Sequence, residues 1–282
     1  MATNILVSAA ELEALLGADR CIPVDCRFEF SDTGKGRADW RAGHIPGAAY
    51  AHLDEDLSSP ITEQSGRHPL PESTHFAAYL ASIGWSPAKL LVAYDEGSNA
   101  VASRLWWLMR YFGQPSALLD GGLAAWVASG RPLEQGDTAR PATAVVELQP
   151  NESIKIETAT ILEKLGTGEP LVLDARASQR FRGEVEPLDT RAGHIPGSIN
   201  RPFGSNLEMS GRFKSREALR EEFIELLAGR DPRTLAHSCG SGVTACHNLF
   251  AMELAGLEGS RLYPGSWSEW IRDPARPIET NG

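Results

Sequence analysis

The chain has 282 residues, enough for one large or two ordinary domains, and 42% of them are hydrophobic and 23% charged. No apolar run approaches the roughly 18 residues that a membrane-spanning helix requires, and the start "MATNILVSAAELEALLGADR" lacks the basic and apolar regions of a secretory signal, so we expect a cytoplasmic protein with no membrane partner. The net charge of −10 argues against nucleic acid as a partner and means that an anion site would need locally placed arginines.

Short β-branched runs alternate with amphipathic stretches along the whole chain. In chain order the pattern predicts a helix at 9–16, a strand at 22–25, a helix at 75–82, a strand at 90–94, a helix at 156–165, a strand at 171–174, a helix at 216–227 and a strand at 234–237. This alternation is typical of a parallel sheet flanked by helices. The predicted fold class is therefore α/β.

The chain also repeats itself. The segment "RAGHIPGAAY" at 41–50 recurs as "RAGHIPGSIN" at 191–200, with seven consecutive identities. The neighbouring segments match in the same order, "IPVDCR" with "LVLDAR", "LVAYDEGSNAVASRL" with "LAHSCGSGVTACHNL", and "GGLAAW" with "GSWSEW". Two copies of one domain are therefore expected.

The segment "EQGDTARPATAVVELQPNES" at 134–153 separates the two copies. It is rich in proline, threonine and polar residues and has no helical period, which is typical of a linker between domains. We therefore predict one domain at 1–137 and a second, including most of the linker, at 138–282.

One cysteine stands at the position where α/β folds carry their functional loops. Cys239 heads the run "CGSGVT", directly after the predicted strand, which ends near Ser238. If residues 239–244 wrap around its side chain and a helix follows, several backbone N–H groups and a helix N-terminus point at one sulfur. Such a cradle favours a thiolate or a persulfide, and Gly240 and Gly242 suit backbone that curls so tightly. Cys239 is the predicted nucleophile.

The alternative is that Cys239 is a buried structural cysteine, which is the more common role of an arbitrary cysteine. The glycine pattern after it reverses that preference. The other three cysteines have no such loop, and no CxxC pair suggests a metal site or a disulfide framework. We expect reduced thiols, no bound metal, and packing roles for Cys21, Cys26 and Cys246.

The doubled "GHIPG", the "Cys-Gly-Ser-Gly-Val-Thr" loop and the closing "PGSWSEW" resemble the two-domain rhodanese-type sulfurtransferases, and among them the 3-mercaptopyruvate sulfurtransferases. The similarity covers nearly the whole chain. It implies two α/β domains, a catalytic cysteine in the second, a persulfide intermediate and no cofactor. The position that matches Cys239 in the first half is Asp95, and a carboxylate cannot carry a sulfane sulfur. The first domain is therefore predicted to be non-catalytic.

The loop also bears on the identity of the sulfur donor. Rhodaneses that prefer thiosulfate, a dianion, usually carry cations within this loop, whereas this chain has Gly240 and Ser241 there. Neutral residues make a monocarboxylate thiol such as 3-mercaptopyruvate the better electrostatic match. The other loop residues expected to contact the substrate are Gly242, Val243 and Thr244.

Donors for the substrate carboxylate are expected in "ASQRFRGEVEPLDTRAGHIPG" at 177–197, because the planar fork of arginine suits a carboxylate. Arg180 matches a substrate-binding arginine of the mercaptopyruvate enzymes. Their second arginine follows a "Pro-Glu-Pro" segment, whereas this chain reads "VEPLDTR", two residues shorter before "GHIPG", with Asp189 near the expected place and Arg191 as a residue that could compensate by position. Arg191 and Arg182 are further candidates, and either could instead be a surface residue.

Asp56, His68 and Ser241 correspond to a proposed acid–base relay of the family, which would move protons to and from the substrate or acceptor thiol. Taken without the resemblance, Asp56 and His68 would be ordinary loop residues. Residues that we assign to structure rather than chemistry are His237, His247, Trp267 and Trp270.

The sequence thus predicts transfer of sulfur from 3-mercaptopyruvate, through a Cys239 persulfide, to cyanide, a small thiol or thioredoxin, with release of pyruvate. Thiosulfate:cyanide transfer is the alternative within the class, and a non-catalytic binding module is the alternative outside it. Phosphoryl transfer is disfavoured, because Ala245 stands where a Cys-x5-Arg phosphatase loop has its arginine.

Overall fold

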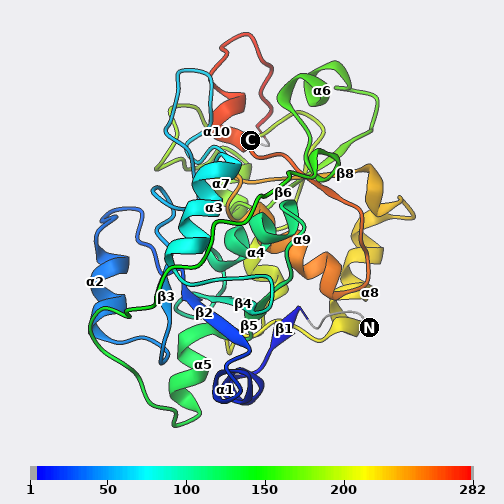
Figure 1. The fold of residues 1–282 in the computed structure, drawn as a ribbon. Coiled ribbons are helices and arrows are strands. Elements are labelled where there is room, and N and C mark those ends of the chain that lie inside the picture. The colour runs from blue at the N-terminus through cyan, green and yellow to red at the C-terminus, as the bar shows by residue number, and fades with distance from the viewer. Residues whose placement is uncertain (1–4, 281–282) are drawn as a thin grey trace. The chain divides into compact units, whose positions relative to one another are not determined.

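The structure is a computed structural model that describes residues 5–280. Within this range the chain forms two compact units, each built around one copy of the repeat (Figure 1). The first unit comprises residues 5–59, 70–151 and 209–213, and the second comprises 60–69, 152–208 and 214–280. Each half of the chain therefore contributes one short segment to the unit formed mainly by the other half.

The first unit contains a five-stranded parallel sheet in the order β1-β5-β4-β2-β3. Its strands are β1 (Leu6–Val7), β2 (Cys21–Asp25), β3 (Ala49–Tyr50), β4 (Leu90–Tyr94) and β5 (Ser116–Leu119). Every residue of β2 is buried, because helices cover both faces of a sheet of this kind. This explains why the strands read as apolar runs rather than as alternating patterns.

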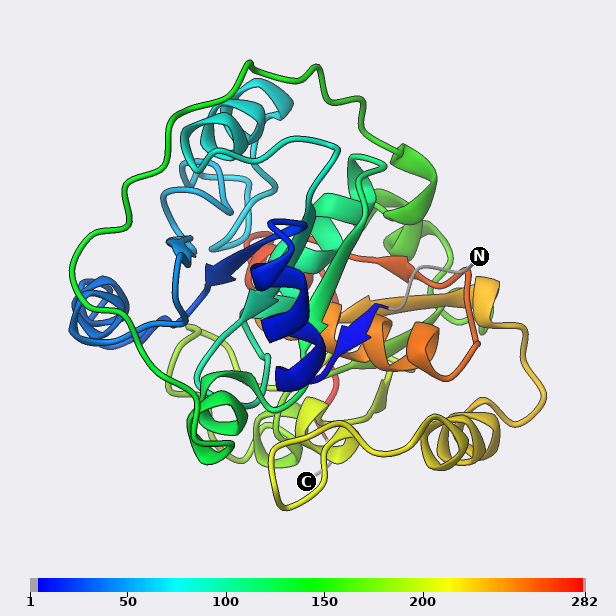
Figure 2. The same cartoon turned by 60° about the horizontal axis from the view of Figure 1, so that its bottom comes forward.

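The described residues of this unit form five helices: α1 (Ala9–Gly17), α2 (Lys35–Ala42), α3 (Ser73–Ser82), α4 (Ala102–Tyr111) and α5 (Gly122–Ala128). Leu12 of α1 and Trp126 of α5 join one apolar cluster with residues of β4 and β5. The ribbon of α1, in dark blue, lies against the sheet in Figure 2. On β5, Ala117 faces that cluster, whereas the Ser116 hydroxyl donates to the Trp106 carbonyl of α4. Because neighbouring strand residues point to opposite faces, α4 covers the other face.

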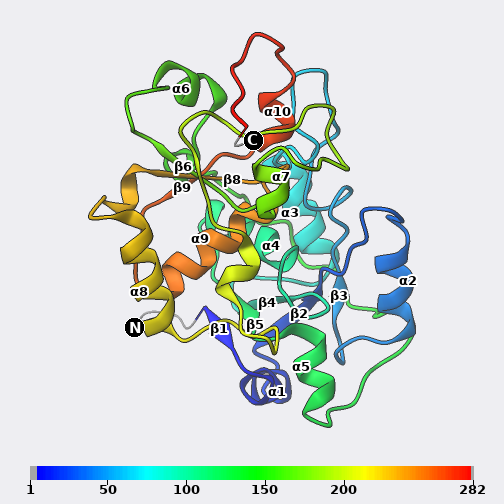
Figure 3. The ribbon, with the colours of Figure 1, turned by 180° about the vertical axis from the view of Figure 1, so that it is seen from behind.

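The second unit repeats this plan with the parallel order β7-β6-β8-β9, which corresponds to β3-β2-β4-β5. α6 and α10 pack on one face of the sheet, and α8 lies beside α9, which contacts β8 (Figure 3). The elements are α6 (Thr158–Glu163), β6 (Leu171–Asp174), α7 (Ser178–Phe181), β7 (Ile199–Asn200), α8 (Arg216–Leu227), β8 (Leu235–Ser238), α9 (Ala245–Leu254), β9 (Arg261–Leu262) and α10 (Ser266–Trp270), with short 3-10 turns at Glu152–Ile154, Phe203–Asn206 and Pro232–Thr234.

The predicted α/β fold class, with two parallel sheets, is confirmed. One predicted helix, 156–165, spans only Thr158–Glu163 in the structure. It starts later than predicted because the Ile156 N–H donates to the Leu262 carbonyl at 2.8 Å, next to a bridge between Lys155 and Leu262. Both "GHIPG" segments have a structural role. The Nδ1 atoms of His44 and His194 hydrogen-bond the backbone carbonyls of Trp40 and Phe181, each at 2.7 Å. None of the described helices is long and apolar enough to cross a membrane.

His237, on β8, is a polar side chain that is completely buried. Its Nε2 lies 3.0 Å from the Ser260 hydroxyl, and its Nδ1 has no hydrogen-bond partner within residues 5–280. Burial lowers its pKa to about 3. Below an ordinary histidine pKa of about 6.5, the unfolded chain therefore binds a proton that the folded chain does not. Acidification from neutral pH should lower the free energy of unfolding through this residue.

The His237→Gln variant isolates this contribution. At neutral pH the variant is expected to be less stable than the parent. From about pH 7.5 to about pH 5 the difference in unfolding free energy between parent and variant should shrink by about 2 kcal/mol. Only the parent loses stability over this range through residue 237, because its imidazole takes up a proton in the unfolded chain and not in the folded one. Urea unfolding at both pH values measures it. A difference that does not change with pH would contradict the assignment.

Candidate active site

Cys239 lies in the loop between strand β8 and helix α9. It is the first residue after β8, and its side chain is buried, with 2% of the residue exposed. The N–H of Gly242 donates to its Sγ at 3.2 Å. Thr244 is the N-cap of α9, so the positive end of a ten-residue helix closes the loop. Both features stabilise negative charge on the sulfur.

Neighbouring backbone and hydroxyl groups hold this loop in shape. The Cys239 N–H donates to the Ser266 hydroxyl at 3.0 Å, and the Cys239 carbonyl accepts the Trp267 N–H at 3.0 Å. The Ser268 N–H donates to the Gly240 carbonyl at 2.8 Å. The first residues of α10 are therefore joined to the cysteine loop by three hydrogen bonds.

The two loop glycines have different surroundings. Gly242 has φ +76°, and a Cβ built there would lie 2.3 Å from the Pro264 carbonyl oxygen. Gly240 has no such backbone strain, but a Cβ there would lie 2.9 Å from Nη2 of Arg67 and 3.6 Å from Nη1 of Arg180. Positive φ and backbone crowding therefore explain Gly242, whereas Gly240 lies beside the ends of two guanidinium groups.

The other loop residues and the nearby cysteine have simple surroundings. Val243 is buried in the core, and Thr244 is only partly exposed at the helix start. The Cys246 thiol donates to the Gly242 carbonyl at 3.3 Å. Cys246 is thus a packed residue that also steadies the peptide next to the N–H that reaches the Cys239 sulfur.

Two of the three predicted relay residues meet. His68 Nδ1 lies 2.6 Å from the Ser241 hydroxyl, and both residues are buried. His68 reaches this position because residues 60–69 belong to the second unit. Asp56 belongs to the first unit, where its carboxylate accepts the His52 N–H at 2.7 Å and burial raises its pKa. The role of Asp56 in a relay stays a prediction.

Arg180 is held by two carboxylates. On α7, its Nε and Nη2 donate to Glu186 at 3.1 and 2.6 Å, and Nη2 also reaches Asp189 at 3.2 Å. Its Nη1 points toward Gly240. This places a positive charge beside the cysteine loop, as a carboxylate-binding role would require.

The two further arginine candidates have different surroundings. Arg182 is 40% exposed and pairs with its neighbour Glu184, as expected for a surface residue. Arg191 is partly buried, and its carbonyl accepts the indole N–H of Trp267 at 2.9 Å. Its Nη1 is buried and has no hydrogen-bond partner in the part of the chain that the structure describes.

Each copy of the repeat contains a buried ion pair between an arginine and the aspartate that ends a strand. Arg176 forms a bidentate pair with Asp174, and its guanidinium stacks on the Trp267 ring at 4.8 Å. Arg27 pairs with Asp25 in the same way in the first unit. Because this pair recurs where there is no cysteine, it marks the fold rather than the chemistry. Trp267, only 1% exposed, is a packing residue, as expected.

The sequence analysis missed Arg67. Its guanidinium forms an ion pair with Asp189, the same carboxylate that binds Arg180. A signal was available, because "SGR" at 65–67 recurs as "SGR" at 210–212. A match of three residues is too short to be informative by itself. It becomes informative in the structure, where residues 60–69 belong to the second unit and residues 209–213 belong to the first.

The first unit carries a carboxylate at the position of Cys239. The Asp95 side chain accepts the N–H groups of Gly97 at 3.1 Å, Asn99 at 2.7 Å and Val101 at 3.0 Å. Burial raises its pKa, and these N–H groups act against that rise. The loop of the first unit therefore also directs backbone N–H groups at one side chain, and here that side chain is the carboxylate of Asp95.

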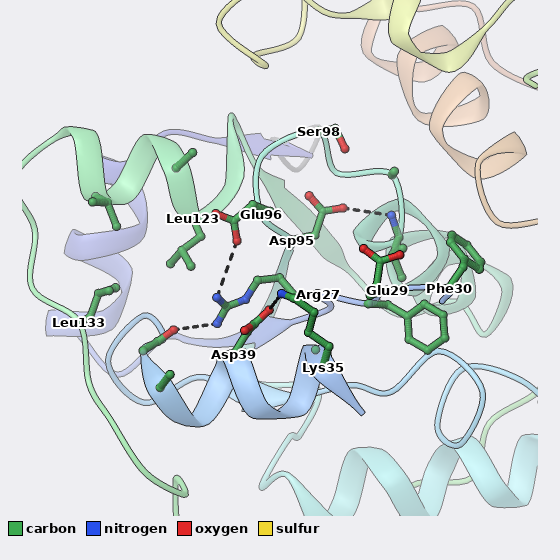
Figure 4. Close-up of a pocket in the computed structure, with 18 of the residues that line it drawn as sticks. Arg27, Glu29, Phe30, Lys35, Asp39, Asp95, Glu96, Ser98, Leu123 and Leu133 are labelled. Carbon is green, nitrogen blue, oxygen red and sulfur yellow. Dashed lines mark hydrogen bonds and ion pairs between the residues drawn. The ribbon is translucent and has the colours of Figure 1, made fainter. Parts of the chain in front are cut away.

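A pocket of about 1010 Å³ lies beside Asp95 in the first unit (Figure 4). Charged residues line one part of it, with Arg27 and Glu96 forming an ion pair at 3.7 Å, and Leu123 and Leu133 line another. None of the described residues that line it is a cysteine. This pocket therefore has no thiol that could receive sulfur.

Comparison with known proteins agrees with this geometry. A model of the Rhodanese-like domain matches residues 8–129 and 157–273. The chain is 46% identical to the "Probable 3-mercaptopyruvate sulfurtransferase" of Pseudomonas aeruginosa over 99% of each chain, and 35% identical to the thiosulfate sulfurtransferase of Gallus gallus over 83% of this chain and 81% of that one. The crystal structure of SseA from Escherichia coli, described as a 3-mercaptopyruvate sulfotransferase, superposes with a TM-score of 0.81 at 31% identity, covering 94% of this chain and 100% of that one. The family model matches once in each half, and the chain belongs to the rhodanese-like family, as a two-domain sulfurtransferase.

Proposed function

We propose that this protein transfers sulfur from 3-mercaptopyruvate through a persulfide on Cys239 and releases pyruvate. The observation that supports this most is the buried Cys239 sulfur, which accepts the Gly242 N–H at 3.2 Å, next to a loop glycine that arginines approach. A thiolate in this loop is stabilised as an anion, and a carboxylate substrate finds a cation within reach. The relatives named for mercaptopyruvate support the same donor.

In the first half-reaction the Cys239 thiolate attacks the thiol sulfur of 3-mercaptopyruvate. The new S–S bond forms as the C–S bond breaks, and the electron pair of that bond passes to the substrate carbon as the enolate of pyruvate. The proton of the substrate thiol ends on that carbon. Backbone N–H groups of the loop stabilise the charge on the persulfide, and Arg180 holds the carboxylate.

The Ser241–His68 pair is suited to carry the proton in this step. Its 2.6 Å hydrogen bond joins a hydroxyl in the cysteine loop to an imidazole, which can accept a proton from the substrate thiol and return it to the carbon. Because the neutral loop carries no lysine or arginine of its own, proton transfer and charge stabilisation fall to this pair and to the amides.

In the second half-reaction an acceptor nucleophile takes the outer sulfur and regenerates the Cys239 thiolate. We propose cyanide, a small thiol or thioredoxin as the acceptor, in a ping-pong cycle, and the cytoplasm as the place of action. The first domain, residues 1–137, is proposed to be non-catalytic, because Asp95 fills its loop, and residues 138–282 carry the catalytic domain.

The test is a matched steady-state comparison of 3-mercaptopyruvate and thiosulfate as donors, with cyanide as acceptor. We expect kcat/KM to be at least about tenfold higher for mercaptopyruvate, a difference of about 1.4 kcal/mol in transition-state binding. Preference for thiosulfate would overturn the donor assignment and favour the alternative activity. Activity with neither donor would overturn the proposed function and favour a binding module.

A further inference from the structure

Ser266, the first residue of α10, has a backbone conformation that serine rarely adopts. Its φ is +52°, in the left-handed region where an L side chain is strained. The residue is also completely buried, so its hydroxyl is removed from water. A glycine at this position would avoid the strain and would bury no polar side chain. The presence of serine therefore indicates that its hydroxyl has a specific use.

The Ser266 hydroxyl joins the backbone of the nucleophile to the turn before α10. It accepts the Cys239 N–H at 3.0 Å and donates to the Tyr263 carbonyl at 2.9 Å. Because its one proton goes to that carbonyl, its lone pairs are available to the Cys239 N–H. Cys239 is buried, and a buried N–H that loses its acceptor is costly.

The first unit has the same turn without this hydroxyl. In each unit a backbone N–H of the following helix donates to the carbonyl of the loop residue, at 2.9 Å for Asp95 and 3.0 Å for Cys239. The residue that matches Ser266 is Gly122, with a φ of +57°. A Cβ there would lie 2.5 Å from the Asp95 carbonyl oxygen. The left-handed position thus carries glycine beside the aspartate and serine beside the cysteine.

The two loop side chains differ in how firmly their own hydrogen bonds hold them. The Asp95 carboxylate accepts N–H groups from three loop residues, at distances from 2.7 to 3.1 Å. The Cys239 sulfur accepts the Gly242 N–H at 3.2 Å, and sulfur is a weak acceptor. A carboxylate is therefore fixed through its own oxygens, whereas the cysteine needs its backbone held in place.

From this comparison we infer that Ser266 is a positioning residue for Cys239. By binding the Cys239 N–H it fixes the direction in which the side chain leaves the main chain, and so keeps the sulfur at the Gly242 N–H. A displacement of about 1 Å at a reacting atom can reduce a rate about 100-fold. The inference rests on the proposed function, because it takes Cys239 as the nucleophile.

Two substitutions separate the hydroxyl from the strain. Ser266→Gly removes both, whereas Ser266→Ala removes the hydroxyl and keeps the strained side chain. We expect kcat with 3-mercaptopyruvate to fall about 30-fold in both variants, while KM stays within about threefold. The melting temperature of Ser266→Gly should be about 3 °C above that of Ser266→Ala, because glycine relieves the backbone.

Alkylation by iodoacetamide tests the position of the sulfur without turnover. At pH 7 the rate at Cys239, followed by mass spectrometry of its peptide, should fall at least about fivefold in Ser266→Gly. A sulfur that moves away from the loop N–H groups is less stabilised as a thiolate and reacts more slowly. If the parent shows no sulfur transfer but this difference in alkylation persists, the proposed function fails and the positioning role stands.

Ala228 provides a matched control in the second unit. It is the exposed C-cap of α8 and has a φ of +48°. Ala228→Gly removes a Cβ from a left-handed residue without removing a hydroxyl. It should raise the melting temperature and leave kcat, KM and the alkylation rate within about twofold of the parent.

Three results would overturn the inference. The first is parent-like kcat and alkylation in Ser266→Gly. The second is a loss confined to Ser266→Ala, which would assign the effect to strain and packing. The third is an equal loss in Ala228→Gly, which would show that the cysteine responds to any change of backbone strain in this unit.

Discussion

Replacing Cys239 with serine will reduce sulfur transfer by at least about 10⁴-fold with either donor. The hydroxyl fits the loop and can accept the Gly242 N–H that now reaches the sulfur at 3.2 Å. It cannot form a persulfide, so the ping-pong cycle has no intermediate. Steady-state assays give the rate, and the mass of the intact protein after donor treatment shows whether one sulfur atom has been added.

Cys21→Ala is the control for this experiment. Cys21 is a buried thiol of β2 in the first unit and takes no part in the site. The variant should keep activity within about twofold and should still gain one sulfur atom. If Cys239→Ser gained sulfur or kept turnover, another residue would have to be the nucleophile.

Gly242→Ala is expected to have the second largest effect. The residue has φ +76°, which an L side chain adopts at a cost, and its Cβ would lie 2.3 Å from the Pro264 carbonyl oxygen. Backbone must move to admit the methyl group, and the N–H that contacts the Cys239 sulfur moves with it. We expect a loss of about 3 kcal/mol in the free energy of unfolding, and a fall in kcat/KM of about 100-fold.

Gly197→Ala separates the two causes. Gly197 has a similar φ of +73°, but a Cβ there would meet no heavy atom within 4 Å. It should therefore show the backbone cost alone, about 1 kcal/mol, with activity unchanged. Urea unfolding and donor kinetics of both variants provide the comparison. Similar losses of activity in the two variants would mean that the geometry of the cysteine loop is not what Gly242 provides.

The sequence by itself determined the features that depend on local pattern. Apolar runs separated by amphipathic stretches specify parallel strands covered by helices, and the repeated "RAGHIPG" specifies two copies. Cys239 could be singled out because the residues that form its loop follow it directly in the chain. Asp95 could also be identified as the counterpart of Cys239, because the two copies can be aligned from the sequence alone.

Tertiary structure decided which distant residues accompany the cysteine. His68 and Arg67 stand more than a hundred positions before Cys239, and nothing in their neighbourhood predicts that residues 60–69 join the second unit. The segment does so because Gly66 permits close contact with Gly265 and because Ser268 receives the Arg67 N–H. Such fits depend on the shape of both partners.

The arginines illustrate the same division. Three of them, Arg180, Arg182 and Arg191, are candidates from sequence because they crowd one short segment. Only the packed structure separates Arg182, which pairs with Glu184 at the surface, from Arg180, which points toward Gly240. Charge alone does not tell where a long side chain ends. Burial and ion-pair partners decide that, and both arise only when the chain has folded.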